Sequence, residues 1–187
     1  MKEKKIKKAI DNACLSKIEL PDDCLDKIIS WMKDPKYFLV FCGNPGVGKT
    51  YLCHAINNFR KDAKKYCWYL KEQELFSKLR DVIKENQDYT HKVREICENE
   101  FLILDDLCSS TMTDWQKEVL FTFVDERCEN CLPTVITSNL YINKQNFDKK
   151  SMLTEFSSRF VSRMSSARNM IIELEWKDKR QDLHEDD

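Results

Sequence analysis

The chain is poor in the residues that interrupt regular structure. Its 187 residues include only three glycines and four prolines, so we expect few and short loops. It also lacks any apolar stretch close to the roughly 18 residues that a membrane helix needs. The net charge is only −1, so nucleic-acid binding would have to come from a local patch or from assembly. These absences predict one soluble domain without a membrane partner.

The cysteines argue for a reducing compartment. There are nine of them, an odd number, and most lie singly within apolar segments. A secreted disulfide framework would place them in the loops of a small domain, whereas buried free thiols fit apolar segments. The basic N-terminus at residues 1–5 is not followed by the apolar core of a secretion signal. We therefore expect a cytoplasmic protein.

Short apolar runs alternate with helical patterns along the chain. Continuous apolar runs are typical of strands buried on both faces, and spaced apolar residues are typical of helices that cover a sheet. We expect strands at 37–42, 67–70, 101–104, 133–139 and about 170–174. We expect helices at about 22–32, 49–58, 71–85, 114–128 and 153–164. This alternation predicts an α/β fold, a parallel sheet with helices on both faces.

A glycine-rich loop lies between the first apolar run and the helix that follows. It fits the pattern G-x-x-x-x-G-K-[ST] completely, with the residues Gly43, Asn44, Pro45, Gly46, Val47, Gly48, Lys49 and Thr50. The backbone N–H groups of such a loop meet the positive end of the helix dipole, which makes an anion site. Lys49 can reach the β- and γ-phosphates, and the Thr50 hydroxyl can bind magnesium. The loop, together with Tyr51, therefore predicts a site for ATP and Mg²⁺.

Two aspartates follow the third apolar run. The run at 101–104 ends in Asp105 and Asp106, which has the form of a Walker B strand. Such a strand delivers carboxylates to the carboxyl edge of the sheet, beside the phosphate loop. We expect Asp105 to hold Mg²⁺, directly or through water, and Asp106 to polarise the attacking water. Helix-capping or loop aspartates are the alternative interpretation.

Two polar features come later in the chain. The fourth apolar run ends in Thr137, Ser138 and Asn139, which could also be an ordinary turn signal. Arg159 and Arg163 are four residues apart, so they share one helix face. A rigid, bidentate arginine suits phosphate oxygens across a subunit boundary, but exposed salt bridges, for example with Glu155, explain the pair as well.

Taken in order, these motifs resemble those of the DnaC/IstB family of AAA+ ATPases, which includes bacterial helicase loaders and transposition helpers. The matching segments are 43–56, 101–107, 133–140 and 158–164. The resemblance implies a P-loop NTPase fold, an AAA+ αβα sandwich with a parallel sheet and no large C-terminal lid domain. It divides the chain into a short basic, helical extension (1–36), an AAA+ ATPase core (37–180) and an acidic tail (181–187).

The resemblance also implies roles for the later polar residues. Asn139 would be the sensor 1 residue that orients water near the γ-phosphate, with Ser138 as the second candidate. Arg159 and Arg163 would lie on the arginine-bearing helix that completes the site of a neighbouring subunit, which implies self-association into a ring or filament. One departure is Cys108, because the family usually has a glycine there, after the Walker B aspartates.

The function implied is that of an ATPase acting on DNA, a DnaC-like loader that binds single-stranded DNA and delivers a replicative helicase. Hydrolysis would be slow and stimulated by assembly or by DNA. An IstB-like transposition helper is the nearest alternative. A nucleotide-controlled binding module with negligible turnover stays open, as does a small-molecule P-loop kinase, although no arginine-rich lid is evident.

The segment after the second strand is the expected DNA contact. Phe76, Lys78 and Arg80 offer an aromatic ring and two cations there, which is the usual single-strand grip. An amphipathic helix with Phe76 in the core explains the same residues.

Overall fold

A computed structural model describes residues 13–15, 20–109, 111–142 and 151–175. The expected acidic tail at 181–187 and the first twelve residues of the expected basic extension lie outside the described residues. In the part of the chain that is described, no helix is both long and apolar enough to cross a bilayer.

Five parallel strands form one sheet in the order β2-β3-β4-β1-β5. The strands are β1 (Phe38–Gly43), β2 (Trp68–Lys71), β3 (Leu102–Leu107), β4 (Thr134–Ser138) and β5 (Met170–Leu174). Each coincides with an apolar run that the sequence marks as a strand. The strand β4 lies between β1, which leads into the glycine-rich loop, and β3, which carries the two aspartates. Because the strands are parallel, both β1 and β3 end at the same edge of the sheet.

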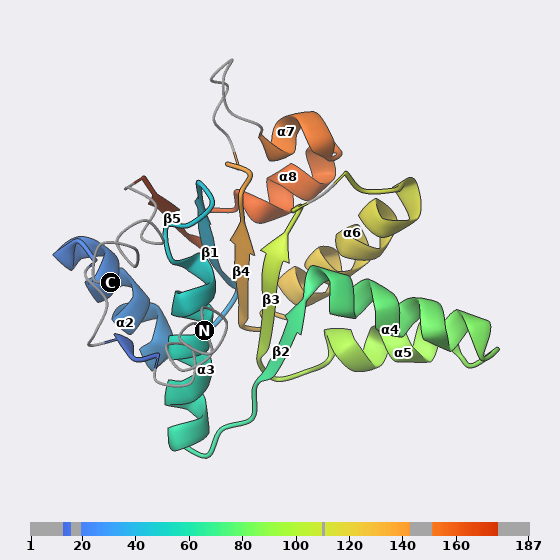
Figure 1. Cartoon of the computed structure of the whole chain (residues 1–187), viewed down its shortest axis with the longest axis horizontal. Helices are drawn as coiled ribbons and strands as arrows, with labels where there is room; N and C mark the ends of the chain where they lie inside the picture. The colour runs from blue at the N-terminus through green and yellow to red at the C-terminus, as the bar shows by residue number, and fades with distance from the viewer. Residues whose placement is uncertain (1–12, 16–19, 110, 143–150, 176–187) are drawn as a thin grey trace, which may run out of the picture.

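Helices cover both faces of the sheet (Figure 1). They are α2 (Asp22–Lys33), α3 (Lys49–Asp62), α4 (Glu72–Lys84), α5 (Tyr89–Cys97), α6 (Asp114–Glu129), α7 (Met152–Glu155) and α8 (Ser158–Met164). In β1, Leu39 and Phe41 pack with residues of α2 and α3, whereas Phe38 and Val40 pack with residues of α4 to α8. This alternation is the period of two of a strand buried on both faces, and it confirms the αβα sandwich.

Two helical predictions need correction. The nine-residue helix α5 lies where no helix is predicted, and the side chain of its N-cap Asp88 accepts the His91 N–H at 2.9 Å. The single helix expected over 153–164 is wrong, because the chain is extended at Phe156 and Ser157 caps a new helix by accepting the Phe160 N–H at 3.3 Å. A serine that satisfies the first N–H groups favours a fresh helix start at that point.

A buried arginine joins two segments at the amino edge of the sheet. Arg127 of α6 is 1% exposed. Its guanidinium donates to the Thr134 hydroxyl at 2.7 Å and to the carbonyls of Cys97 at 2.6 Å, Asn99 at 2.9 Å and Pro133 at 2.8 Å. Burial lowers the pKa of Arg127 to about 10. The segment before β3 and the start of β4 are therefore tied to one side chain.

Candidate nucleotide-binding site

The phosphate loop depends on glycine for its shape. Gly43, Gly46 and Gly48 have φ values of 148°, 86° and 96°, which other residues rarely adopt. A Cβ at Gly43 would lie 2.2 Å from the Leu174 carbonyl oxygen, so only glycine lets β5 run this close to β1. Gly48 is the N-cap of α3 and has no side chain to accept the first N–H groups of that helix. These donors are therefore available to an anion.

The loop's lysine lies inside the loop. Lys49 is 7% exposed, and its ammonium donates to the carbonyl oxygens of Gly43 at 2.7 Å and Asn44 at 2.8 Å. Val47 packs into the core beneath α2 and α3, which anchors the middle of the loop. The Tyr51 hydroxyl contacts the N-terminal segment, where it accepts the Cys14 N–H at 3.4 Å.

The first aspartate of β3 is completely buried and is surrounded by hydroxyl groups. Asp105 Oδ1 accepts hydrogen bonds from the Thr137 hydroxyl at 2.6 Å and the Thr50 hydroxyl at 3.2 Å. Its Oδ2 accepts one from the Tyr69 hydroxyl at 2.6 Å. The structure thus brings together the last residue of the phosphate loop and the acidic strand, 55 residues apart in sequence.

Tyr69 and Thr137 are site residues that the sequence analysis did not select. The Tyr69 ring stacks on His54 with a centroid distance of 4.7 Å, and its hydroxyl lies 3.3 Å from His54 Nε2. Burial, followed by the nearby Cys53 and Asp105, raises the pKa of Tyr69, so this hydroxyl stays protonated and remains a donor. The sequence signal that could have identified both residues is a hydroxyl side chain inside an otherwise apolar strand.

The second aspartate has a different environment. Asp106 is exposed, has a φ of 62°, and donates its N–H to the Thr137 hydroxyl at 2.8 Å. Partial burial and the neighbouring Asp105 raise the pKa of the Asp106 carboxyl, whereas Lys49 and Lys71 act in the opposite direction. This carboxyl is therefore the one that faces solvent at the strand tip.

A buried glutamate holds the turn after the aspartates. Glu72, at the start of α4, is 2% exposed, and its carboxylate accepts the Cys108 N–H. Cys108 has a φ of 62°, the left-handed conformation that glycine adopts most easily. Burial raises the pKa of Glu72, although the N–H groups of Cys108 and Ser109 act in the opposite direction.

The polar end of β4 lies between the two motifs. Ser138 is in register with Cys42 of β1 and Leu107 of β3, so Asn139 follows at the carboxyl edge. The Ser138 hydroxyl is buried and donates to the Leu107 carbonyl at 2.8 Å, whereas Asn139 is half-buried. Asn139 is therefore the more accessible of the two sensor candidates.

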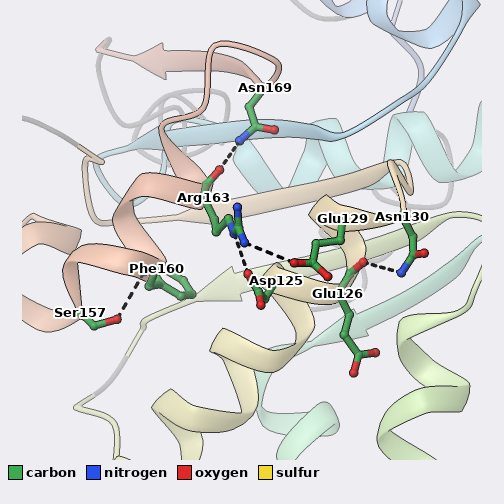
Figure 2. A network of polar contacts seen from close by, with 8 residues as sticks. All are labelled: Asp125, Glu126, Glu129, Asn130, Ser157, Phe160, Arg163 and Asn169. Carbon is green, nitrogen blue, oxygen red and sulfur yellow. Dashed lines mark hydrogen bonds and ion pairs between the residues drawn. The ribbon is translucent and has the colours of Figure 1, made fainter.

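The two arginines of α8 have different surroundings. Figure 2 shows that Arg163 points to α6, where it pairs with Asp125 at 2.6 Å and with Glu129 at 3.4 Å. Arg159 is exposed, and its guanidinium carbon lies 5.1 Å from the centroid of the Phe121 ring. Within the described residues, neither arginine bonds to the phosphate loop of its own chain. The salt-bridge partners of Arg163 are thus acids of α6 and not Glu155.

The aromatic residue expected to contact DNA is part of the core. Phe76 is 0% exposed, and its ring centroid lies 5.8 Å from that of Trp115. Phe76 therefore offers no ring to a base. The alternative interpretation, an amphipathic helix with Phe76 in the core, is confirmed. Lys78 and Arg80 are exposed on α4.

The chain is similar to several known proteins. The family model described as IstB-like ATP binding protein matches residues 23–166. The replicative helicase loader DnaC of Buchnera aphidicola subsp. Acyrthosiphon pisum is 24% identical over 144 residues, covering 76% of this chain and 56% of that protein. The chromosomal replication initiator protein DnaA of Mesoplasma florum is 28% identical over 156 residues, covering 79% of this chain and 35% of that protein.

Solved structures share the fold. A crystal structure of the DnaC helicase loader has a TM-score of 0.73 at 23% identity and covers 88% of this chain and 98% of that one. AMPPCP-bound DnaA from Aquifex aeolicus has a TM-score of 0.71 at 16% identity, and the match covers 90% of this chain and 52% of that one. The chain spans little more than half the length of the curated loader, 56%. Because the family model matches more than half of its residues, the chain belongs to the family of IstB-like ATP-binding proteins.

Proposed function

We propose that the chain binds ATP with Mg²⁺ between the phosphate loop and the tip of β3, and hydrolyses it slowly. One observation carries the proposal: the Thr50 hydroxyl lies 3.2 Å from the buried Asp105 carboxylate. A hydroxyl and a carboxylate are oxygen donors of the kind that Mg²⁺ prefers. The residues present also fit the triphosphate, because the N-terminus of α3 has no side-chain cap and no acidic residue in its first turn.

Each residue then has a definite task. Thr50 and Asp105 would hold Mg²⁺, which when bound neutralises charge on the phosphate oxygens. Lys49 would bind the β- and γ-phosphates after leaving the two loop carbonyls. Asp106 would accept a proton from the attacking water, which Asn139 orients.

Completion of the site would come from a second subunit. Arg159 is exposed on α8 and could reach a nucleotide held by a neighbouring chain, in a ring or filament. Arg163 would support it, because its ion pairs with α6 fix the helix that carries both arginines. Because an isolated chain lacks the arginine of a neighbour, we expect it to hydrolyse ATP slowly. Assembly or DNA should accelerate the reaction.

The cellular role that we propose is that of a DnaC-like loader that binds single-stranded DNA and delivers a replicative helicase in the cytoplasm. The DnaC relatives support this role, and the nine free cysteines fit a reducing compartment. An IstB-like transposition helper is the second candidate, favoured by the family model itself. The family assignment favours both over a metabolite kinase.

Nucleotide binding is tested with a fluorescent ATP analogue and magnesium. Lys49→Ala should weaken binding at least tenfold, because it removes a charge-assisted contact to phosphate worth about 1.5–3 kcal/mol. Lys78→Ala is the matched control, since Lys78 is exposed on α4 and should leave the affinity unchanged. Equal affinities for the wild type and Lys49→Ala would contradict the proposed site.

The partner is tested by pull-down of a replicative helicase with the full chain, in the presence of ATP or of no nucleotide. A loader should retain the helicase only with ATP, and Lys49→Ala should retain none. Recovery of a transposase in place of the helicase would support the second candidate. Phosphoryl transfer to a metabolite without any DNA-stimulated hydrolysis would overturn both.

A further inference from the structure

The far end of α3 carries a surface that the nucleotide site does not use. We call residues 59–66, the last turn of α3 and the loop towards β2, the α3 tip. It lies at the bottom of Figure 1, at the opposite end of α3 from the phosphate loop. A helix of 14 residues is about 21 Å long, so a ligand here would not compete with ATP.

Two large rings are exposed at the α3 tip. Phe59 is 55% exposed and Tyr66 is 62% exposed, more than any other large hydrophobic residue that the structure describes. Within the described residues, neither ring stacks on another aromatic side chain. Exposing aromatic surface to water is unfavourable, so two exposed rings within one eight-residue segment suggest contact with a ligand.

Three lysines lie between the two aromatic residues in the sequence. Lys61, Lys64 and Lys65 are all exposed, and none forms an ion pair within the described part of the chain. Asp62 is the one acidic residue of the α3 tip. Lys61 lies in the last turn of α3, where it also compensates the helix dipole. Compensation of the helix dipole does not explain Lys64 and Lys65, which come after the helix ends.

The α3 tip is held in a fixed conformation. Arg60 is 9% exposed and donates from Nε and an Nη to the Tyr66 carbonyl at 3.2 and 2.8 Å, while its guanidinium lies 3.8 Å from the Phe101 ring centroid. The N–H groups of Lys64 and Lys65 bond back to the end of α3, each at 2.9 Å. A buried guanidinium therefore fixes the backbone that presents Tyr66, which lowers the entropic cost of binding.

We propose that the α3 tip binds single-stranded nucleic acid, with bases stacked on Phe59 and Tyr66 and phosphates beside Lys61, Lys64 and Lys65. Exposed rings at both ends of a segment with three exposed lysines match unpaired bases on a charged backbone. The inference rests on the proposed function for its DNA-linked role, and it goes beyond that function by placing the contact one helix length away from the nucleotide.

The ring contribution is tested by fluorescence anisotropy with labelled oligo(dT) and oligo(rU). Tyr66→Leu and Phe59→Leu should each weaken binding about fivefold or more, the loss typical of one stacked base. Tyr66→Phe keeps the ring and should bind like the wild type. The two probes distinguish DNA from RNA as the preferred strand. Unchanged thermal unfolding should accompany each variant, because both rings are exposed.

The cation contribution is tested by the salt dependence of the same binding. Lys64→Ala combined with Lys65→Ala should reduce the slope of log K against log salt by about 1.4, since each phosphate contact on a single strand contributes about 0.7. Lys78→Ala combined with Arg80→Ala is the α4 control pair. These two exposed cations are the DNA contact that the sequence predicts, so the slope should stay unchanged here if the α3 tip is the contact.

Three results would overturn the α3 tip proposal: no binding of either probe by the wild type, equal affinity of the tip variants and the wild type, or an equal loss for Tyr66→Phe and Tyr66→Leu. A loss confined to the α4 control pair would place the contact there instead. Affinity for the ATP analogue is measured separately. It shows whether the proposed ATP site is wrong, whatever the result for the α3 tip.

Discussion

The carboxylate of Asp105 is held by hydroxyl groups that come from three separate elements. Thr50 belongs to α3, Tyr69 to β2 and Thr137 to β4, and all three donate to the one buried side chain. A buried carboxylate with this many hydrogen bonds has a fixed position. The orientation of the magnesium ligand that we propose is thus set before any metal arrives.

Thr137→Val tests this arrangement at the scale of one residue. The change keeps the shape but removes the donor to Asp105 and the acceptor of the Asp106 N–H. We expect a loss of about 1–3 kcal/mol in the free energy of unfolding, because partly buried polar groups lose their partners. Urea denaturation followed by circular dichroism measures it.

The control is Thr122→Val on α6, where the hydroxyl donates to the Glu118 carbonyl of its own helix. Valine and threonine have similar helix propensity, so we expect a change below about 0.5 kcal/mol. Equal losses of unfolding free energy at Thr137 and Thr122 would contradict this expectation. They would show that the hydrogen bond to Asp105 stabilises the fold no more than a hydroxyl bond within a helix does.

Single residues were predictable only where a motif fixes them. The positions of Lys49, Thr50 and Asp105 follow from patterns that are local in sequence. Their partners Tyr69 and Thr137 could not be found this way, because these hydrogen bonds depend on the order of the strands and join residues 36 and 32 positions from Asp105.

At the scale of elements, the approach of β5 to β1 depends on Gly43. We expect Gly43→Ala to cost roughly 3 kcal/mol or more, because its Cβ would lie 2.2 Å from a backbone oxygen of Leu174. Gly48→Ala meets no atom within 4 Å and carries only the strain of its φ of 96°, about 1–2 kcal/mol.

Thermal unfolding of both glycine variants without nucleotide provides the measurement. A larger loss for Gly48→Ala than for Gly43→Ala would contradict the close approach of the two strands. The comparison separates steric exclusion from backbone strain, since both glycines occupy the same loop.

Strands were easier to predict than helices in this chain. A strand buried on both faces leaves a continuous apolar run, and all five runs became strands. The helix α5 was missed because only Val93, Ile96 and Cys97 of its nine residues are buried. The break at Phe156 was missed because no glycine or proline marks it, and a serine cap alone is a weak signal.

At the scale of the whole molecule, the proposed site is shared between subunits. We expect Lys49→Ala and Arg159→Ala chains to be inactive separately, the first without nucleotide and the second without the exposed arginine. Mixed in equal amounts, they should recover about a quarter of wild-type ATPase activity, because one random interface in four pairs an intact loop with an intact Arg159.

Steady-state ATP hydrolysis measures this recovery. Arg163→Ala separates support of α8 from contact with the nucleotide. The ion pair of Arg163 with Asp125 is partly exposed, so its loss should change thermal unfolding little and should reduce hydrolysis less than Arg159→Ala does. Co-assembly of the two inactive chains without any recovered hydrolysis would exclude a role for Arg159 across the interface.

The guanidinium that joins the segment before β3 to the start of β4 affects how mutational data on this chain should be interpreted. Replacing Arg127 removes the guanidinium donor from three carbonyls and a threonine hydroxyl. The strand that carries Asp105 and the strand that precedes Asn139 then lose their common anchor. An arginine scan intended to find groups that touch phosphate would therefore score Arg127 as indispensable, although its contribution is made entirely through folding.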